Sequence, residues 1–282
     1  MTHDHILTLA CPDRIGIVHA VTGFLAERRA NITEAAQYND ASTGLFFMRM
    51  RFAAVALAHE ALHEAFAPLA ASMAMRWSLT PASHRPATLI MVSKLGHCLN
   101  DLLFRHRSGL LPVDIRGIVS NHRDYYQLAA SYNIAFHHIP VTAETKQQAE
   151  ARLVQLIDDE KAELVVLARY MQVLSDDLCR RLDGRAINIH HSFLPSFKGA
   201  RPYFQAHARG VKLIGATAHY VTADLDEGPI IEQDVERVDH TLAAEDFTAV
   251  GRDIECVVLA RAVRWHVEHR VLINGHKCVV FR

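Results

Sequence analysis

The chain has 282 residues, half of them (50%) hydrophobic, and its 30 basic and 31 acidic side chains leave a net charge of −1. This length accommodates one large domain or two ordinary ones, and the charge gives no electrostatic reason to expect nucleic acid or an anionic membrane as a partner. No apolar run approaches the roughly 18 residues of a bilayer-spanning helix, and the N-terminus lacks the features of a signal peptide. Five scattered cysteines without a CxxC pair indicate reduced thiols in a cytoplasmic protein.

Residues 1–83 carry the pattern of a small domain of their own. Four strands are expected at residues 5–11, 32–40, 44–52 and 73–80, with helices at residues 16–29 and 57–69. This βαββαβ order is that of a ferredoxin-like split βαβ unit, with helices on one face of the sheet. Pro81 and Pro86 then interrupt all periodicity, so we place the boundary of the second domain at residue 84.

Residues 84–282 alternate short apolar strands with helical segments, which is typical of an α/β fold with a doubly wound, mostly parallel sheet. The expected strands span residues 87–93, 113–121, 134–141, 163–170, 186–192, 213–221 and 229–238. Helices are expected at residues 145–160 and 242–270, and an Asn-Gly pair at residues 274–275 predicts a final hairpin. Ligands of such sheets bind beyond the carboxyl ends of the strands, where the sequence NIHH stands at residues 188–191.

The polar residues of this strand end allow three interpretations. A metal site is disfavoured because adjacent strand residues such as His190 and His191 point to opposite faces, and no HExxH or CxxC motif lies nearby. In an acid–base site, Asn188 and His190 share one face and can both donate hydrogen bonds to an oxyanion. Asp226 is then the candidate carboxylate, with Asp224 as the second choice. In the third interpretation Asn188 caps backbone groups and both aspartates are ordinary turn residues.

Two ordered motifs resemble the formyltransferase fold family, which uses 10-formyltetrahydrofolate. They are NIHHSFLPSFKGARPY at residues 188–203 and GATAHYVTADLDEGPII at residues 215–231. The resemblance covers roughly residues 87–282 and implies a catalytic trio of Asn188, His190 and Asp226. The sequence LARYMQVLS at residues 167–175 resembles the family's folate segment. The substrate contacts implied by the resemblance are Met171, Gln172, Val173, Leu174, Asp224, Leu225 and Lys198, the last toward the folate glutamate tail.

Members of that family differ in the molecule that receives the formyl group. The purine-pathway members hold a phosphorylated amine in a glycine-rich loop, whereas this chain reads KLGH at residues 94–97 and keeps one glycine there. The tRNA-formylating members carry an additional C-terminal domain, and this chain ends soon after its closing helix. Water is the remaining acceptor.

The resemblance therefore implies hydrolysis of 10-formyltetrahydrofolate to tetrahydrofolate and formate, with no cofactor or metal, for formate supply to purine synthesis or for folate recycling. Two alternatives stay open. One is a formyltransferase that uses an unidentified small amine, with Lys94 and His97 as acceptor contacts. The other is a non-enzymatic sensor of folate and an amino acid.

The N-terminal residues 9–32, LACPDRIGIVHAVTGFLAERRANI, resemble an ACT domain, a small regulatory fold that commonly binds amino acids. The resemblance implies a regulatory site at Asp13, Arg14, Gly16 and Asn31, where donors at a helix start would receive a ligand carboxylate. It also implies a homo-oligomer paired through these domains. An ACT domain fused to a formyltransferase fold is the arrangement of the formyltetrahydrofolate deformylases, so a folate substrate and an amino-acid effector are the expected ligands.

Overall fold

The computed structural model describes residues 2–55, 58–195 and 202–282, and the chain divides into two compact units. Unit 1 holds the N-terminal residues up to His84 together with residues 268–274 and 278–282, and unit 2 holds residues 85–267 and 275–277. The two ends of the chain thus meet in one unit, whereas the sequence placed all of residues 84–282 in the second domain. Periodicity shows that the last residues form a hairpin, but it carries no information on which sheet that hairpin joins.

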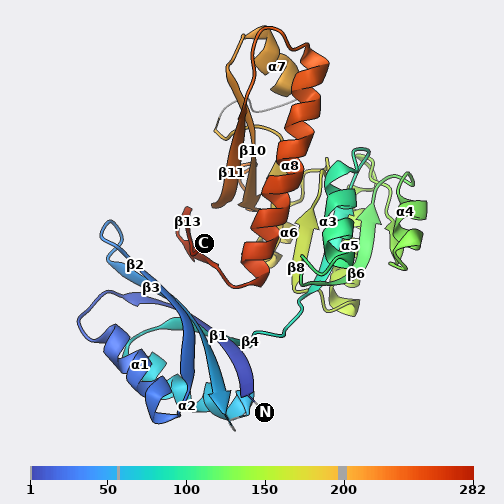
Figure 1. Ribbon diagram of the computed structural model, residues 1–282. Coiled ribbons are helices and arrows are strands. Elements are labelled where there is room, and N and C mark those ends of the chain that lie inside the picture. Colours follow the sequence, from blue (N-terminus) through green and yellow to red (C-terminus); the bar gives the residue numbers. More distant parts are fainter. Residues whose placement is uncertain (1, 56–57, 196–201) are drawn as a thin grey trace. The chain divides into compact units, whose positions relative to one another are not determined.

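Unit 1 contains an antiparallel sheet in the order β2-β3-β1-β4, with both helices of the unit on one face (Figure 1). In chain order its N-terminal elements are β1 (Thr2–Pro12), α1 (Ile17–Glu27), β2 (Asn31–Asp40), β3 (Leu45–Val55), α2 (His59–Ser72) and β4 (Arg76–Pro81). This is the βαββαβ order expected from the sequence, and the fold is ACT-like.

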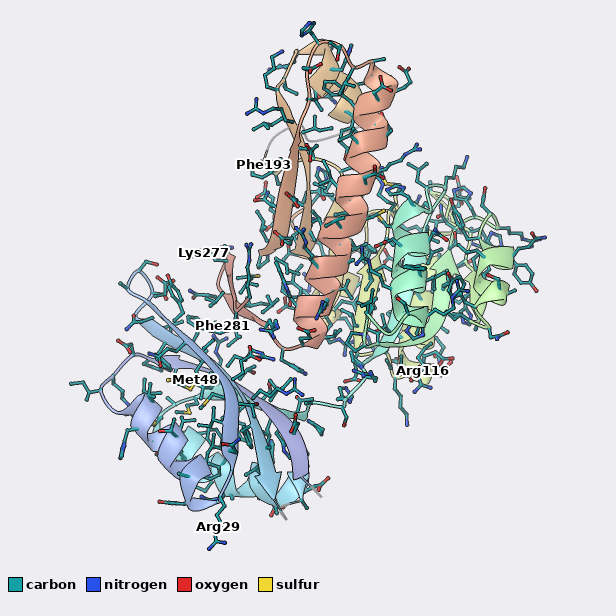
Figure 2. All side chains as sticks on the ribbon, viewed as in Figure 1. Arg29, Met48, Arg116, Phe193, Lys277 and Phe281 are labelled. Carbon is teal, nitrogen blue, oxygen red and sulfur yellow. The ribbon has the colours of Figure 1, made fainter. Side chains whose placement is uncertain are left out.

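The two faces of that sheet bury different partners because successive side chains of a strand point to opposite sides. Met48 belongs to the apolar cluster beneath the helices, whereas its neighbour Phe47 packs with Phe281 from the end of the chain (Figure 2). The C-terminal strands of this hairpin are β12 (Val271–Asn274) and β13 (Lys277–Val280). The buried Arg49 of β3 also holds the segment that leads into this hairpin. Its Nε and Nη2 donate hydrogen bonds to the Glu268 carbonyl oxygen at 3.1 and 3.0 Å.

Unit 2 is built on a seven-stranded sheet in the order β11-β10-β9-β8-β5-β6-β7. Strands β5 to β9 run parallel to one another, and β10 is antiparallel to both β9 and β11, so the mostly parallel sheet expected from the sequence is confirmed. Its elements are β5 (Ala87–Val92), α3 (His97–Arg107), β6 (Asp114–Ser120), α4 (Tyr126–Ser131), β7 (Phe136–His138), α5 (Lys146–Asp159), β8 (Leu164–Leu167), α6 (Asp176–Arg181), β9 (Ala186–His190), α7 (Pro202–Ala208), β10 (Leu213–Tyr220), β11 (Ile230–Arg237) and α8 (Ala244–Val267).

Helices cover this sheet on both faces. Apolar residues of α5 and α6 form one cluster with alternate residues of the central strands, among them Met91 and Val165. The intervening residues Ile90 and Val166 point the other way, toward the face on which α3 and α8 pack against each other. Across the described residues no helix, the 24-residue α8 included, is long and apolar enough to cross a membrane. All five cysteines are free thiols.

Candidate active site

The strand end singled out by the sequence is the carboxyl end of β9, where β10 pairs with it in antiparallel register. This register sets Asn188 opposite His219 and His190 opposite Thr217. Residues two apart on a strand share a face, so these side chains gather on one side of the sheet. The buried Thr217 Oγ1 accepts a hydrogen bond from the Leu194 backbone N–H at 3.0 Å and donates to the Ser192 carbonyl oxygen at 2.9 Å. These bonds fix the turn that follows β9.

Asp226 lies in the turn between β10 and β11, and its side chain reaches the carboxyl end of β9. Its φ of 58° is left-handed, a conformation in which only glycine, asparagine and aspartate are common. Two residues later the chain runs against β10 so closely that a Cβ on Gly228 would lie 1.8 Å from the Tyr220 carbonyl oxygen. Glycine is therefore required at residue 228, and the tight turn that it allows folds Asp226 back over the strand end.

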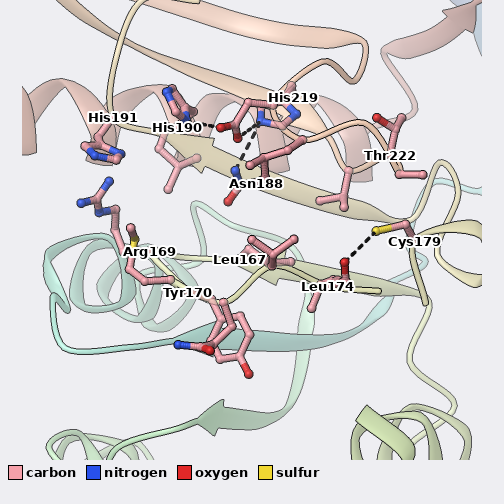
Figure 3. Close-up of a pocket in the computed structure, with 18 residues that line it drawn as sticks. Leu167, Arg169, Tyr170, Leu174, Cys179, Asn188, His190, His191, His219 and Thr222 are labelled. Atoms are coloured by element: carbon pink, nitrogen blue, oxygen red, sulfur yellow. Dashed lines mark hydrogen bonds and ion pairs between the residues drawn. The ribbon is translucent and has the colours of Figure 1, made fainter. Parts of the chain in front are cut away.

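Asp226 joins the two strands of the site through its two carboxylate oxygens, one toward His190 and the other toward His219, which Figure 3 labels. His190 Nδ1 lies 3.1 Å from Oδ2, and His219 Nε2 lies 3.6 Å from Oδ1. The trio expected from the sequence, Asn188, His190 and Asp226, therefore comes together in space. His190 is 5% exposed, and its Nε2 is buried with no hydrogen-bond partner among the described residues.

His219 is a member of this cluster that the sequence analysis did not select. Its Nδ1 lies 2.8 Å from the Tyr220 carbonyl oxygen, which can only accept, so Nδ1 carries the hydrogen. In the neutral ring Nε2 then accepts from the Asn188 side-chain amide at 3.3 Å, whereas in the protonated ring the same nitrogen presents its N–H to Asp226. That bond holds the Asn188 amide in place and leaves its second N–H for a ligand. The sequence feature that could have identified His219 is its position as the single histidine in the apolar strand β10.

Charge and hydrogen bonding keep Asp226 ionised. Burial alone would raise the pKa of this carboxyl, but the hydrogen bonds from His190 and His219, together with their positive charge, outweigh it. The pKa of Asp226 consequently lies well below its usual range. At neutral pH the carboxylate can orient His190 and balance a positive charge on its ring.

A cavity of about 240 Å³ opens beside these groups. Of the expected substrate contacts, Met171, Gln172, Val173, Leu174 and Leu225 line it together with the trio. Asp224 does not: its side chain is exposed, and its backbone carbonyl oxygen accepts hydrogen bonds from Thr222 and Glu227 within the turn. The Asp224 alternative for the catalytic carboxylate therefore loses its geometric basis. Lys198 lies outside the described residues.

The segment after β8 forms the opposite wall of this cavity. Ser93, at the end of β5, accepts a hydrogen bond from the Met171 backbone N–H at 3.0 Å and donates to the Asn121 side chain at 2.7 Å. Met171 and Val173 are 55% and 56% exposed, whereas Leu174 is buried. The segment thus offers partly open apolar side chains and backbone groups on a wall that is fixed to two strands.

His191 also lines the cavity, although adjacent strand residues point to opposite faces. The strand ends at His190, so the alternation of side chains stops there, and the two rings lie 5.2 Å apart. Burial, and secondarily the positive charge of Arg169, lowers the pKa of His191 to about 4. His191 is accordingly neutral at physiological pH.

Arg169 lies at the same end of the cavity and is the second residue that the sequence analysis passed over. It is 6% exposed, and its Nε is 3.3 Å from the Glu255 carboxylate of α8. Glu255 is itself buried and accepts hydrogen bonds at 2.8 Å from both His97 Nε2 and the Tyr203 hydroxyl. Burial alone would raise the pKa of Glu255, but the His97 hydrogen bond and the Arg169 charge lower it.

Residues 94–97 follow β5, where a glycine-rich loop would stand, and His97 among them belongs to this buried network. Gly96 is needed for packing, because a Cβ there would lie 2.2 Å from the Tyr125 ring. Within the described part of the chain, the potential metal ligands that come within 4.8 Å of one another are those of His97, Cys98 and Glu255. The Glu255 oxygens are already bonded to His97 and Tyr203, with a guanidinium alongside, so the carboxylate is satisfied without an ion.

The predicted regulatory residues lie in unit 1, around the turn between β1 and α1. Asp13 accepts a hydrogen bond from the Asn39 side chain, and Arg14 donates to the Ser72 carbonyl oxygen at 3.0 Å. Gly16 has a φ of 94° and directly precedes α1, and Asn31 is the exposed first residue of β2. Asp13 and Arg14 thus tie the turn to two other parts of unit 1.

Known proteins share both the fold and the sequence of unit 2. The formyl transferase family matches residues 87–263, so the chain belongs to this family. Glycinamide ribonucleotide transformylase 1 from Symbiobacterium toebii has a similar structure, with a TM-score of 0.66 and 28% identity over 71% of this chain and 95% of its own.

Other relatives match unit 1 as well. A formyltetrahydrofolate deformylase of Corynebacterium sp. (strain P-1) is 56% identical over 280 residues, which cover 99% of this chain and 98% of that protein. The crystal structure of formyltetrahydrofolate deformylase from Burkholderia mallei ATCC 23344 matches 99% of this chain and 100% of its own, with a TM-score of 0.96 and 55% identity. Within the formyl transferases, the chain belongs to the formyltetrahydrofolate deformylase family.

Proposed function

We propose that this chain hydrolyses 10-formyltetrahydrofolate to tetrahydrofolate and formate at the site of Asn188, His190 and Asp226. One observation carries this proposal: Asp226 holds His190 through Nδ1, His190 lines the cavity, and its buried Nε2 has no partner among the described residues. A buried polar nitrogen without a partner is costly. A substrate oxygen at this position would supply the missing hydrogen bond.

The first step is attack of water on the formyl carbon. The carbonyl oxygen becomes an oxyanion, which receives hydrogen bonds from the free N–H of Asn188 and from Nε2 of a protonated His190. Asp226 balances the charge of that ring. Donors that are fixed before the reaction stabilise such charge without reorganisation, and the contact between His219 and Asn188 supplies that fixation.

The second step is cleavage of the bond between the formyl carbon and N10. The attacking water loses protons as formate forms, and N10 gains one as tetrahydrofolate leaves, so the net products are tetrahydrofolate, formate and one proton. The pair of Asp226 and His190 is placed to accept and return the transferred proton. The wall formed by residues 171–174 would hold the flat pterin through its backbone groups and apolar side chains, and Leu225 would close over it.

All the groups needed for this chemistry are side chains of the protein, so the proposed reaction uses no metal and no further cofactor. The test is incubation of the purified protein with 10-formyltetrahydrofolate alone, in buffer containing a chelator and no amine. Formate and tetrahydrofolate should appear in equal amounts and at the same rate as without the chelator. Formylation of an added amine with only trace formate would instead support the formyltransferase alternative.

We further propose that the protein works in the cytoplasm as a homo-oligomer paired through its ACT-like units and regulated by an amino acid at the Asp13–Gly16 turn. The start of α1, where no side chain caps the backbone N–H groups, favours this class of ligand, since a helix start attracts a carboxylate. Sedimentation of the full chain with and without each amino acid, combined with activity measurements, tests both parts of the proposal.

A further inference from the structure

The cavity has two chemically different ends. Figure 3 shows Leu174, Cys179 and Thr222 on one side of Asn188, and Arg169 with His191 on the other. The first end adjoins the wall proposed for the pterin. Since the formyl group must lie at the trio between the two ends, the end at Arg169 is the side from which the acceptor of the formyl group approaches.

Arg169 is held at that end by an unusual backbone and a buried counter-charge. Its φ of 65° is left-handed, a conformation that residues with a Cβ disfavour and that glycine adopts more easily. The Nε side of the guanidinium faces Glu255, which does not line the cavity. Nη1 is buried and has no hydrogen-bond partner among the described residues, although the side chain borders the cavity.

We propose that Arg169 is the residue that selects water over amines as the acceptor of the formyl group. This inference rests on the proposed hydrolysis and concerns a step that the trio does not decide, because the trio activates the formyl carbon for any nucleophile. Glu255, His97 and Tyr203 act as positioning residues that hold the guanidinium in place.

Two properties of the guanidinium produce the selection. Its fixed positive charge repels an amine that arrives protonated, whereas water carries no charge. Its free N–H groups must donate to an acceptor. Water has two lone pairs, so it can accept a hydrogen bond from Arg169 and still attack the formyl carbon with the other pair. An amine nitrogen has a single lone pair and cannot do both at once.

The test measures how the formyl group is partitioned between water and a competing amine. The full-length protein is incubated with 10-formyltetrahydrofolate and methylamine, and the ratio of N-methylformamide to formate is determined. Arg169→Met keeps the length of the side chain but removes its charge and donors, and Arg169→Lys keeps both. Because Arg169→Met leaves Glu255 buried without its ion pair, the double variant Arg169→Met/Glu255→Gln is measured alongside it. Arg152→Ala, an exposed arginine of α5, is the matched control.

We expect the ratio of N-methylformamide to formate to rise roughly 10-fold or more in the methionine variants and to stay near the wild-type value in Arg169→Lys and Arg152→Ala. An unchanged ratio in a folded methionine variant overturns the selection by Arg169. Loss of both products in folded methionine variants overturns it too, since Arg169 would then be needed for the reaction itself. If the wild-type protein releases no formate, it is the proposed hydrolysis that fails.

Discussion

The cleft of unit 2 and the Asp13–Gly16 turn of unit 1 differ in the burial of their polar side chains. In the cleft, buried side chains hold one another, and individual atoms such as His190 Nε2 have no partner within the part of the chain that the structure describes. At the turn, Asp13 and Arg14 are exposed and bonded to other residues of unit 1, and Ile15 is fully exposed at 103% of its reference area. The cleft is preorganised for chemistry, while the turn resembles a surface that a ligand or a second subunit would complete.

This difference predicts where substitutions act. Buried polar groups interact in a low local dielectric, so removing one changes the energy of reaction intermediates strongly. Exposed groups are screened by water, and removing one changes stability and turnover little. Loss of activity should therefore decrease from the trio, through the side chains that support it, to the turn of unit 1.

The largest effect is expected for His190→Ala and Asp226→Asn. Each substitution removes oxyanion stabilisation or its counter-charge, so kcat should decrease roughly 100- to 1000-fold while affinity for the folate changes little. The measurements are formate release at saturating substrate and folate binding by fluorescence. Asp224→Asn is the matched control, because this exposed carboxylate lies outside the cavity. Near-normal turnover in either folded trio variant would remove that residue from the mechanism.

A smaller effect is expected for His219→Phe, which keeps a ring but removes the acceptor that holds Asn188. Residues that orient a catalytic group typically contribute about 10- to 100-fold, so kcat should decrease by about 10-fold with KM nearly unchanged. A decrease as large as that of His190→Ala would instead place His219 among the groups that contact the substrate.

The next expected effect is on stability rather than on rate. The unfolded chain binds a proton at residue 191 near pH 6.5, whereas the folded protein binds it only near pH 4. Below pH 6.5 the unfolded state therefore binds more protons, and His191 should reduce the free energy of unfolding by about 2 kcal/mol between pH 7 and pH 5.

His191→Gln removes this titration, so its stability should fall less steeply over the same range. Denaturant unfolding of both proteins at pH 7, 6 and 5 measures the difference, and the other histidines cancel in the comparison. Parallel pH profiles for the two proteins would show that His191 keeps an ordinary pKa in the folded state.

The sequence predicts the elements of both units well because strand and helix periods are local properties. It predicts the trio through two ordered motifs. The remaining residues of the site depend on distant partners. His219 acquires its role from the register of β10 against β9, and Arg169 acquires its role from a carboxylate 86 positions away on α8. The strand alternation does not predict that His190 and His191 both line the cavity, because the exact end of a strand is not encoded in that alternation.

The smallest effect on turnover is expected at the turn of unit 1, in the double variant Asp13→Ala/Arg14→Ala. Both side chains are exposed and lie in the unit that holds none of the trio, so kcat without an effector should equal that of the wild type. The response to an amino acid should be lost, because the contacts to Asn39 and Ser72 that shape the turn are removed. Activity is measured across a panel of amino acids, with Gln37→Ala on the exposed side of β2 as the control. A wild-type protein that responds to an amino acid, and a double variant that responds equally, would place the regulatory site elsewhere in the chain.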